Sequence, residues 1–326
     1  MKFITAKELF ESKPEPVQWV CKPWLAREAI TVLDGAPKSA GKTTFALAMC
    51  AAILRGEEFL GEPTTKTAIV YLTEEARTSF MAAMRRAGIT DTSDFHILFW
   101  RETHQVHDRG SELSAWEQVM DKAVRHAKQV GAKLLVVDTF AQFAKLTGDK
   151  ENSAGDVLMA MRPIQKARDE DLAVLVNRHE RKGGGSVGES GRGSSALSGA
   201  VDIILQLKNP EGRQAETHRK IDALSRFDET PPQMTISLTE DGYQVLGETG
   251  AVAVPVAMNQ ILACLPLDSA DALSMEQLRK RTGLARTTLQ EALSQLQVDD
   301  ALHPLGSGKK GDAYRYRRNA AETPSA

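Results

Sequence analysis

The chain has 326 residues, of which 42% are hydrophobic and 26% are charged, and its formal net charge is −2. This length suits one large domain and a small second one, and the composition is that of a soluble globular protein. The near-neutral charge excludes a polycation, so any contact with nucleic acid must come from local basic clusters.

No run of about 18 apolar residues suggests a membrane span, and the N-terminal stretch carries charges where a signal peptide would need apolar residues. Cys21, Cys50 and Cys264 are far apart and lack metal-type spacing, which favours reduced thiols inside a cell. We therefore expect a cytoplasmic protein with no membrane partner.

The first part of the chain alternates short apolar runs with helix-like segments. Strands are expected at residues 29–33, 67–72, 96–100, 133–139, 172–177 and 201–207, and helices at 43–54, 75–87, 114–130 and 154–167. Continuous apolar strands that alternate with helices predict an α/β fold with a mostly parallel sheet covered on both faces. Three further strands, at 218–224, 233–238 and 242–246, are expected to be antiparallel.

The last part of the chain has a different periodicity. Residues 247–257 are interpreted as a linker, followed by helices at 258–265, 274–281 and 286–296 and two short strands around a Gly-Lys-Lys-Gly tip. Three helices and a hairpin predict a winged helix-turn-helix that binds DNA or protein. The expected domains are therefore residues 1–250 and 251–326, with a frayed tail.

A glycine-rich segment between the first strand and the first helix has the context of a phosphate-binding loop. Backbone N–H groups and Lys42 would hold the phosphates of ATP, and the Thr43 hydroxyl would bind Mg²⁺. The first glycine of the usual motif falls on Ala36, with Gly35 one residue earlier. The expected ATP-binding residues are Ala36, Pro37, Lys38, Ser39, Ala40, Gly41, Lys42, Thr43 and Thr44.

Acidic residues end two of the predicted strands. LLVVD ends on Asp138, where a carboxylate can hold Mg²⁺ through water and meet the phosphates from the opposite side, although a helix cap is the alternative. YLTEE places Glu74 and Glu75 at the same edge, and one of them is the candidate general base. Only one can face the nucleotide, and Glu74 is favoured. Tyr71 is interpreted as a core residue.

These segments, together with residues 178–182, 192–205 and 225–227, resemble RecA-like ATPases, in particular hexameric replicative helicases of the RepA type from plasmids, phages and mobile elements. The resemblance covers residues 17–246. It implies that Glu74 is the catalytic glutamate and that His179 senses the γ-phosphate or the attacking water. A structural histidine at a strand end remains the alternative.

The resemblance also implies that Arg226 is an arginine finger that reaches the nucleotide of a neighbouring subunit. Many related ATPases carry Lys-x-Arg here, whereas this chain has Leu224 in place of the lysine. A finger of this kind would make catalysis depend on assembly into a ring, expected to be a hexamer.

Two basic clusters are candidates for DNA binding. The glycine-rich loop after the predicted strand at 172–177 carries Arg178, Arg181, Lys182 and Arg192, and in a ring it would face the channel and follow a phosphate backbone. A surface loop without a ligand is the alternative. The second cluster, in the predicted winged helix, includes Arg286, Lys309 and Lys310.

The leading hypothesis is an ATP-hydrolysing motor that acts with Mg²⁺ on single-stranded or forked DNA, as a ring-forming replicative helicase or translocase with replication proteins as partners. One alternative is an ATPase that loads helicases or serves recombination or defence without unwinding. Another is a DNA-binding regulator switched by nucleotide.

Overall fold

The computed structural model describes residues 3–11, 16–37, 40–106, 111–151, 153–180, 187–188, 196–209, 217–239, 242–247, 249–282, 284, 286–306 and 314–319. The chain divides into two compact units. The first contains Met1–Asn209, Arg219–Gln233 and Ser237–Val245, and the second contains Leu246–Ala326 with Pro210–His218 and Met234–Ile236.

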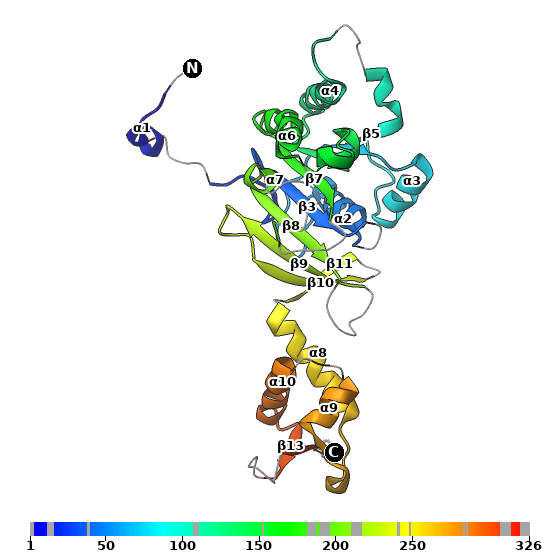
Figure 1. Cartoon of the computed structure of the whole chain (residues 1–326), viewed down its shortest axis with the longest axis vertical. Helices are drawn as coiled ribbons and strands as arrows, with labels where there is room; N and C mark the ends of the chain where they lie inside the picture. The colour runs from blue at the N-terminus through cyan, green and yellow to red at the C-terminus, as the bar shows by residue number, and fades with distance from the viewer. Residues whose placement is uncertain are drawn as a thin grey trace. The chain divides into compact units, whose positions relative to one another are not determined.

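The largest sheet has nine strands in the order β11-β10-β9-β8-β3-β7-β6-β4-β5 (Figure 1). Neighbouring strands from β8 to β5 are parallel, and β9 is antiparallel to β8. The prediction of a mostly parallel sheet is therefore confirmed. The strands are β3 (Ile30–Gly35), β4 (Ile69–Thr73), β5 (Phe95–Phe99), β6 (Leu134–Asp138), β7 (Ala173–His179), β8 (Ile203–Lys208), β9 (His218–Ser225), β10 (Gln233–Thr239) and β11 (Gly242–Gly247).

Helices cover the parallel strands, and their ends follow from the sequence. In α4 (Ala115–Val130), Ser114 and Glu117 form a reciprocal capping box at the start, and Gly131 ends the helix in the left-handed conformation. The other long helices are α2 (Lys42–Arg55), α3 (Arg77–Arg86) and α6 (Ala154–Arg168). Shorter elements are α1 (Ala6–Glu11), β1 (Trp19–Cys21), β2 (Leu25–Ala26), η1 (Trp100–Val106), α5 (Phe140–Phe143), η2 (Gly148–Glu151) and α7 (Ala196–Gly199).

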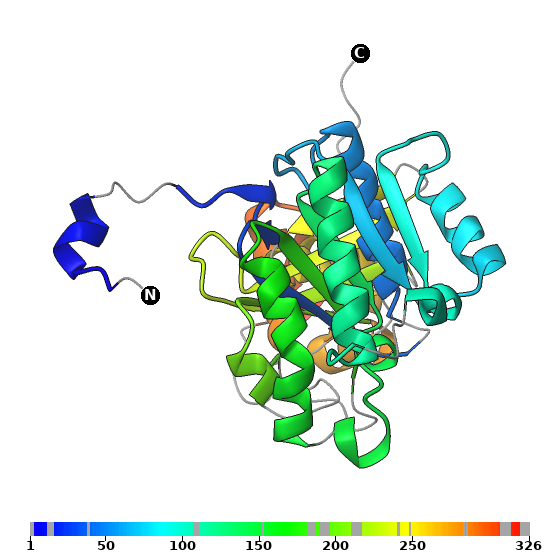
Figure 2. The ribbon, with the colours of Figure 1, turned by 90° about the horizontal axis from the view of Figure 1, so that it is seen from above.

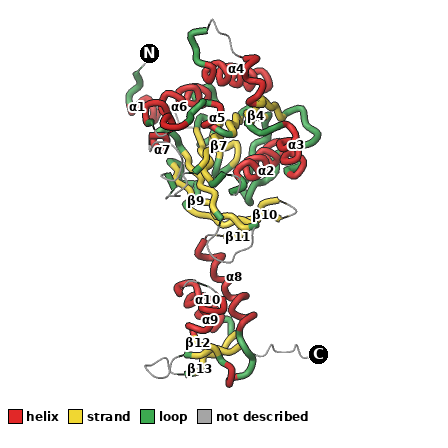
Figure 3. Tube along the Cα trace, turned by 45° about the vertical axis from the view of Figure 1, so that its right-hand side comes forward, coloured by secondary structure: helices red, strands yellow, loops and turns green. Residues whose placement is uncertain are grey.

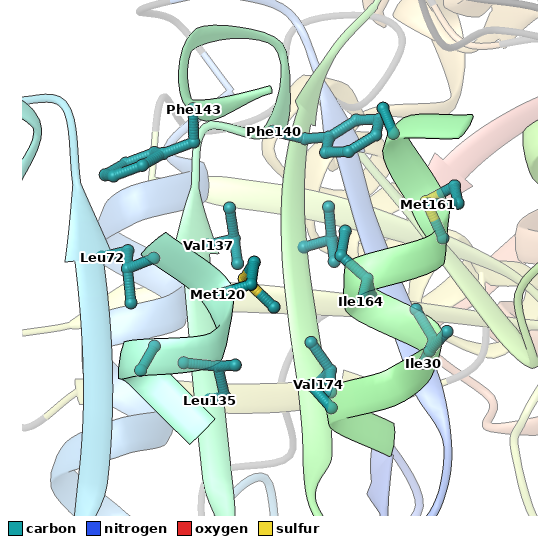
Figure 4. Packing of buried hydrophobic residues seen from close by; sticks show 14 of the residues in the cluster. Ile30, Leu72, Met120, Leu135, Val137, Phe140, Phe143, Met161, Ile164 and Val174 are labelled. Atoms are coloured by element: carbon teal, nitrogen blue, oxygen red, sulfur yellow. The ribbon is translucent and has the colours of Figure 1, made fainter. Parts of the chain in front are cut away.

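Helices α4 and α6 lie side by side across one face of the sheet (Figure 2). Their apolar side chains, among them Met120 and Ile164, pack on alternate strand residues such as Ile30, Val137 and Val174 (Figure 4). Helix α2 lies behind the strands in the same view. Because both faces are covered, every residue of β3, β4 and β6 is buried, as a parallel sheet requires.

The described residues of the second unit form three α-helices and a small antiparallel sheet of order β12-β14-β13 (Figure 3). Its apolar core includes Ile261, Leu278, Leu289 and Leu293. The elements are α8 (Thr249–Cys264), η3 (Ser269–Asp271), β12 (Leu273–Ser274), α9 (Met275–Thr282), α10 (Arg286–Val298), β13 (Leu302–Leu305) and β14 (Arg315–Arg318).

The prediction of a linker over residues 247–257 is wrong, because α8 begins at Thr249 and continues to Cys264. The segment contains glycine and proline, which weaken the local helical signal. Burial of Ala257 and Ile261 in the core of this unit stabilises the helix nonetheless, since tertiary packing supplies most helical stability. Among the described residues, no helix has the length and apolar character needed to cross a bilayer.

Candidate nucleotide-binding site

The glycine-rich segment connects the carboxyl end of β3 to the first residue of α2, as the sequence predicts. A Cβ atom at Gly35 would lie 2.8 Å from the Ala40 Cβ and 3.0 Å from the Leu207 carbonyl oxygen. Gly35 therefore occupies a position where the chain approaches itself too closely for a side chain. Gly41 has a φ of 80° and stands directly before α2.

Lys42 is the first residue of α2, and its side chain turns back over the loop. Its Nζ donates to the carbonyl oxygens of Gly35 at 2.8 Å and Ala36 at 3.1 Å. Burial lowers the pKa of Lys42, and nearby carboxylates, Asp138 first among them, oppose that shift. The ammonium is thus held inside the curve of the loop, where it can meet phosphate oxygens.

Asp138 ends β6 beside the start of α2. Its Oδ2 accepts hydrogen bonds from Thr43 Oγ1 at 2.9 Å and from Tyr71 Oη at 2.8 Å. Burial raises the pKa of Asp138, while the hydrogen bond from Tyr71, the adjacent Asn177 amide and the hydrogen bond from Thr43 oppose the shift. The carboxylate is therefore fixed by two donors in a largely dry position.

The pair of oxygens on Thr43 and Asp138 fits a magnesium ion, which prefers hard oxygen ligands and retains several waters. No group of three or more His, Cys, Asp and Glu side chains suited to a metal occurs in the described part of the chain. The remaining ligands of such an ion would be phosphate oxygens and water.

Glu74 and Glu75 follow β4 at the same edge of the sheet, because Thr73 is in register with Asp138. The Glu74 N–H donates to the Asp138 carbonyl at 2.8 Å, and Glu74 Oε2 accepts from Thr139 Oγ1 at 3.0 Å. Burial raises the pKa of both glutamates. Both are half-buried beside Asp138, so the geometry brings both candidate bases to the site.

His179 ends β7 in register with Gly35, which places it next to the phosphate loop. Its neighbour Arg178 has a different position from the one predicted. Arg178 is 4% exposed and forms a bidentate ion pair with Asp34, with Nε–Oδ1 and Nη2–Oδ2 distances of 2.7 and 2.6 Å. The assignment of Arg178 to DNA binding is therefore wrong, because β7 extends through His179 and turns this side chain into the sheet.

Three further side chains belong to the site, and sequence analysis did not identify them as part of it. Tyr71 is buried as predicted, but its hydroxyl also reaches Asp138. Glu180 is 9% exposed, accepts from Gln206 Nε2 at 2.6 Å and adds to the negative charge around Lys42. Arg219 Nε donates to the Ala40 carbonyl at 3.2 Å. Only Glu180 carried a local signal, since it follows His179 at a strand end.

Arg226 lies at the other end of the sheet. Ser225 is in register with Ile203 at the start of β8, whereas Gly35 is in register with Leu207, four residues further along. At about 3.3 Å per residue, this separation is roughly 13 Å. The exposed Arg226 side chain lies near Asp202, with an Nη1–Oδ1 distance of 3.6 Å.

Several predicted residues cannot be placed. Arg286 begins α10, but its side chain lies outside the described part of the structure. The phosphate-loop residues Pro37, Ala40 and Thr44 are described, whereas Lys38, Ser39, Arg181, Lys182, Arg192, Lys309 and Lys310 lie outside the described residues.

Comparison with known proteins gives a family and a structural likeness. The model of the family described as AAA domain matches residues 2–185, which include Lys42, Glu74, Asp138 and His179. No curated protein sequence matches the chain. The structure is similar to a KaiC-like protein from the hyperthermophilic archaeon Pyrococcus horikoshii OT3, with 17% identity over 71% of this chain and 99% of that chain and a TM-score of 0.49.

Proposed function

The chain belongs to the AAA domain family and is a P-loop ATPase. On this basis we propose that it is a DNA motor, namely a ring-forming helicase or translocase that hydrolyses ATP with Mg²⁺ on single-stranded or forked DNA. The observation that carries the ATPase site is the direct contact of Thr43 with Asp138 beside the curled Lys42 side chain. The DNA substrate rests on the basic loop after β7 and on the resemblance to RepA-type helicases.

Each residue of the site has a proposed role in ATP hydrolysis. Lys42 and the loop N–H groups would bind the phosphates, and Thr43 and Asp138 would hold Mg²⁺, which would supply positive charge to the phosphate oxygens. Glu74 orients and deprotonates the attacking water. Its pKa, raised by burial, brings it closer to the range in which a carboxylate is an effective base at neutral pH.

We propose that Arg226 acts across a subunit interface. Because it stands roughly 13 Å along the sheet from its own phosphate loop, it would act on the nucleotide of a neighbouring subunit. An arginine finger in trans contributes about 10³- to 10⁵-fold to turnover. Subunits with Arg226→Ala mixed with subunits carrying Glu74→Gln should then recover part of the activity, and no recovery at any ratio contradicts the finger.

The second unit is proposed to be a winged helix that contacts duplex DNA through Arg286, Lys309 and Lys310. Three helices with a three-stranded antiparallel sheet support this assignment, as do exposed Arg279 and Lys280 at the end of α9. Neutralising Arg279 and Lys280 together should weaken binding to duplex DNA and reduce its salt dependence. Unchanged binding at low salt would favour a role in protein contacts.

The decisive experiment measures ATP turnover with and without single-stranded DNA, followed by unwinding of a forked duplex. Wild-type protein should show stimulated turnover and strand displacement, and Lys42→Ala should abolish both. Stimulated turnover without displacement would favour a loader, recombination or defence ATPase. Function that persists in Lys42→Ala with no stimulated turnover would favour a nucleotide-switched regulator.

The two glutamates are distinguished by matched variants. Glu74→Gln should bind ATP and hydrolyse it about 10²- to 10⁴-fold more slowly, the usual loss for a general base. Glu75→Gln should be milder. The reverse order of rates would assign the base to Glu75.

A further inference from the structure

Strand β9, which lies outside the parallel part of the sheet, reaches the phosphate loop with its first residues. Lys220 is in register with Lys208 at the end of β8, so Arg219 lies at the same edge of the sheet as Gly35. From there its Nε donates to the Ala40 carbonyl at 3.2 Å, across 179 residues of sequence. The contact joins β9 to the last turn of the loop before α2.

Tyr243 on β11 approaches the same turn. Its ring packs edge-on against Phe45 of α2, with centroids 5.4 Å apart. A Cβ atom on Gly41 would meet the Tyr243 hydroxyl at 3.9 Å and the Arg219 Nε at 4.0 Å. Arg219 and Tyr243 therefore both pack against the outer side of the Ala40–Gly41 peptide.

We infer that Arg219 is a positioning residue for the phosphate loop, which it holds in the orientation that binds the nucleotide. A trans peptide is planar, so its C=O and N–H groups point in opposite directions. When Arg219 holds the Ala40 carbonyl toward β9, it turns the Gly41 N–H away from β9 and into the loop. This inference rests on the proposed ATP site and adds strand β9 to it.

The contact acts on binding rather than on the chemical step. Gly41, with its φ of 80°, has no side chain to restrict its rotation, and fixing it beforehand lowers the entropy lost when phosphate binds. Arg219 contacts the loop from β9, and strands β8, β3 and β7 separate β9 from β6, which carries Asp138. Its loss should therefore raise the dissociation constant for nucleotide and the KM for ATP while kcat at saturating ATP is retained.

The test compares Arg219→Gln with Lys220→Gln in the full chain. The two substitutions each remove one positive charge from adjacent residues of β9. Lys220 forms an ion pair with Asp222, with an N–O distance of 2.9 Å. In Lys220→Gln, Asp222 retains its second ion pair, with Lys208 at 3.2 Å. Arg219→Gln should weaken binding of Mg–ADP about tenfold, the effect of one hydrogen bond from a charged donor. It should change kcat by less than about twofold, since the chemical step is untouched.

Hydrogen exchange without nucleotide provides the second readout. Amides of Ala40, Gly41 and Lys42 should exchange faster in Arg219→Gln than in wild type and remain unchanged in Lys220→Gln. Wild-type exchange and wild-type affinity in Arg219→Gln would overturn the inference, as would equal effects of the two variants. If wild-type protein does not bind Mg–ADP, the proposed function fails, and the exchange comparison still decides whether Arg219 holds the loop. If Arg219→Gln does not fold, Arg219→Lys takes its place in both measurements.

Discussion

Removal of the Tyr71 hydroxyl group tests how Asp138 is held in place. Tyr71 is fully buried in the middle of β4, and its hydroxyl donates to Asp138 Oδ2 at 2.8 Å. Tyr71→Phe keeps the ring and its packing against Phe80 and Phe95 and deletes only the donor. Asp138 would then retain the hydrogen bond from Thr43 in a position where burial already raises its pKa.

The magnitude follows from the burial and charge of the acceptor. A hydrogen bond to a charged group contributes about 1.5–3 kcal/mol, and 1 kcal/mol shifts the melting temperature of a domain of 150–250 residues by about 2–4 °C. Tyr71→Phe should therefore lower the melting temperature of the first unit by roughly 3–12 °C at neutral pH. The loss should shrink as the pH falls through the pKa of Asp138, because the hydrogen bond favours the ionised carboxylate.

Thermal unfolding between pH 4 and pH 8, together with Mg²⁺ titrations of nucleotide binding, measures both consequences. The variant should need more Mg²⁺ for half-maximal binding, since a less restrained Asp138 is a poorer ligand. Tyr316→Phe, which removes the hydroxyl of a buried tyrosine in the core of the second unit, is the control. A Tyr71→Phe protein that melts and binds Mg²⁺ like wild type would refute the positioning of Asp138 by Tyr71.

Three other substitutions have defined outcomes. Because burial raises the pKa of Asp138, ionisation of its carboxyl lowers the stability of the folded protein as the pH rises through that pKa. Asp138→Asn should therefore raise the melting temperature at neutral pH without nucleotide, with a smaller difference in acid. The same variant should have no ATP turnover. Gly35→Ala forces the loop away from the 2.8 Å contact with Ala40, and denaturant titration should show a loss of about 1–3 kcal/mol with weakened nucleotide binding. Arg178→Ala leaves Asp34 buried without its ion-pair partner, and urea unfolding should show a loss of about 3–5 kcal/mol; a stable variant with weakened DNA binding would restore the original assignment.

The phosphate loop and the order of strands and helices could be read from the sequence. The predicted strand at 133–139 corresponds to β6, and the predicted helix at 114–130 corresponds to α4 with its capping box. Apolar runs, amphipathic periods and caps are local features, so they appear in the sequence in the form that the fold uses. The helical segment before Ala257 was missed because its stability comes from packing and not from local propensity.

The sequence by itself determined that β3 leads through a phosphate loop into α2 and that carboxylates stand at the same edge, because each element is contiguous in the chain. Only the tertiary structure decided which side chains hold these groups. The hydrogen bonds from Tyr71 to Asp138, from Arg178 to Asp34 and from Arg219 to Ala40 join residues that are 67, 144 and 179 positions apart in the sequence. Such partners depend on strand order and register, which arise from packing of the whole sheet and have no local pattern. The same basic segment that predicts a DNA contact therefore contains an arginine that the sheet buries.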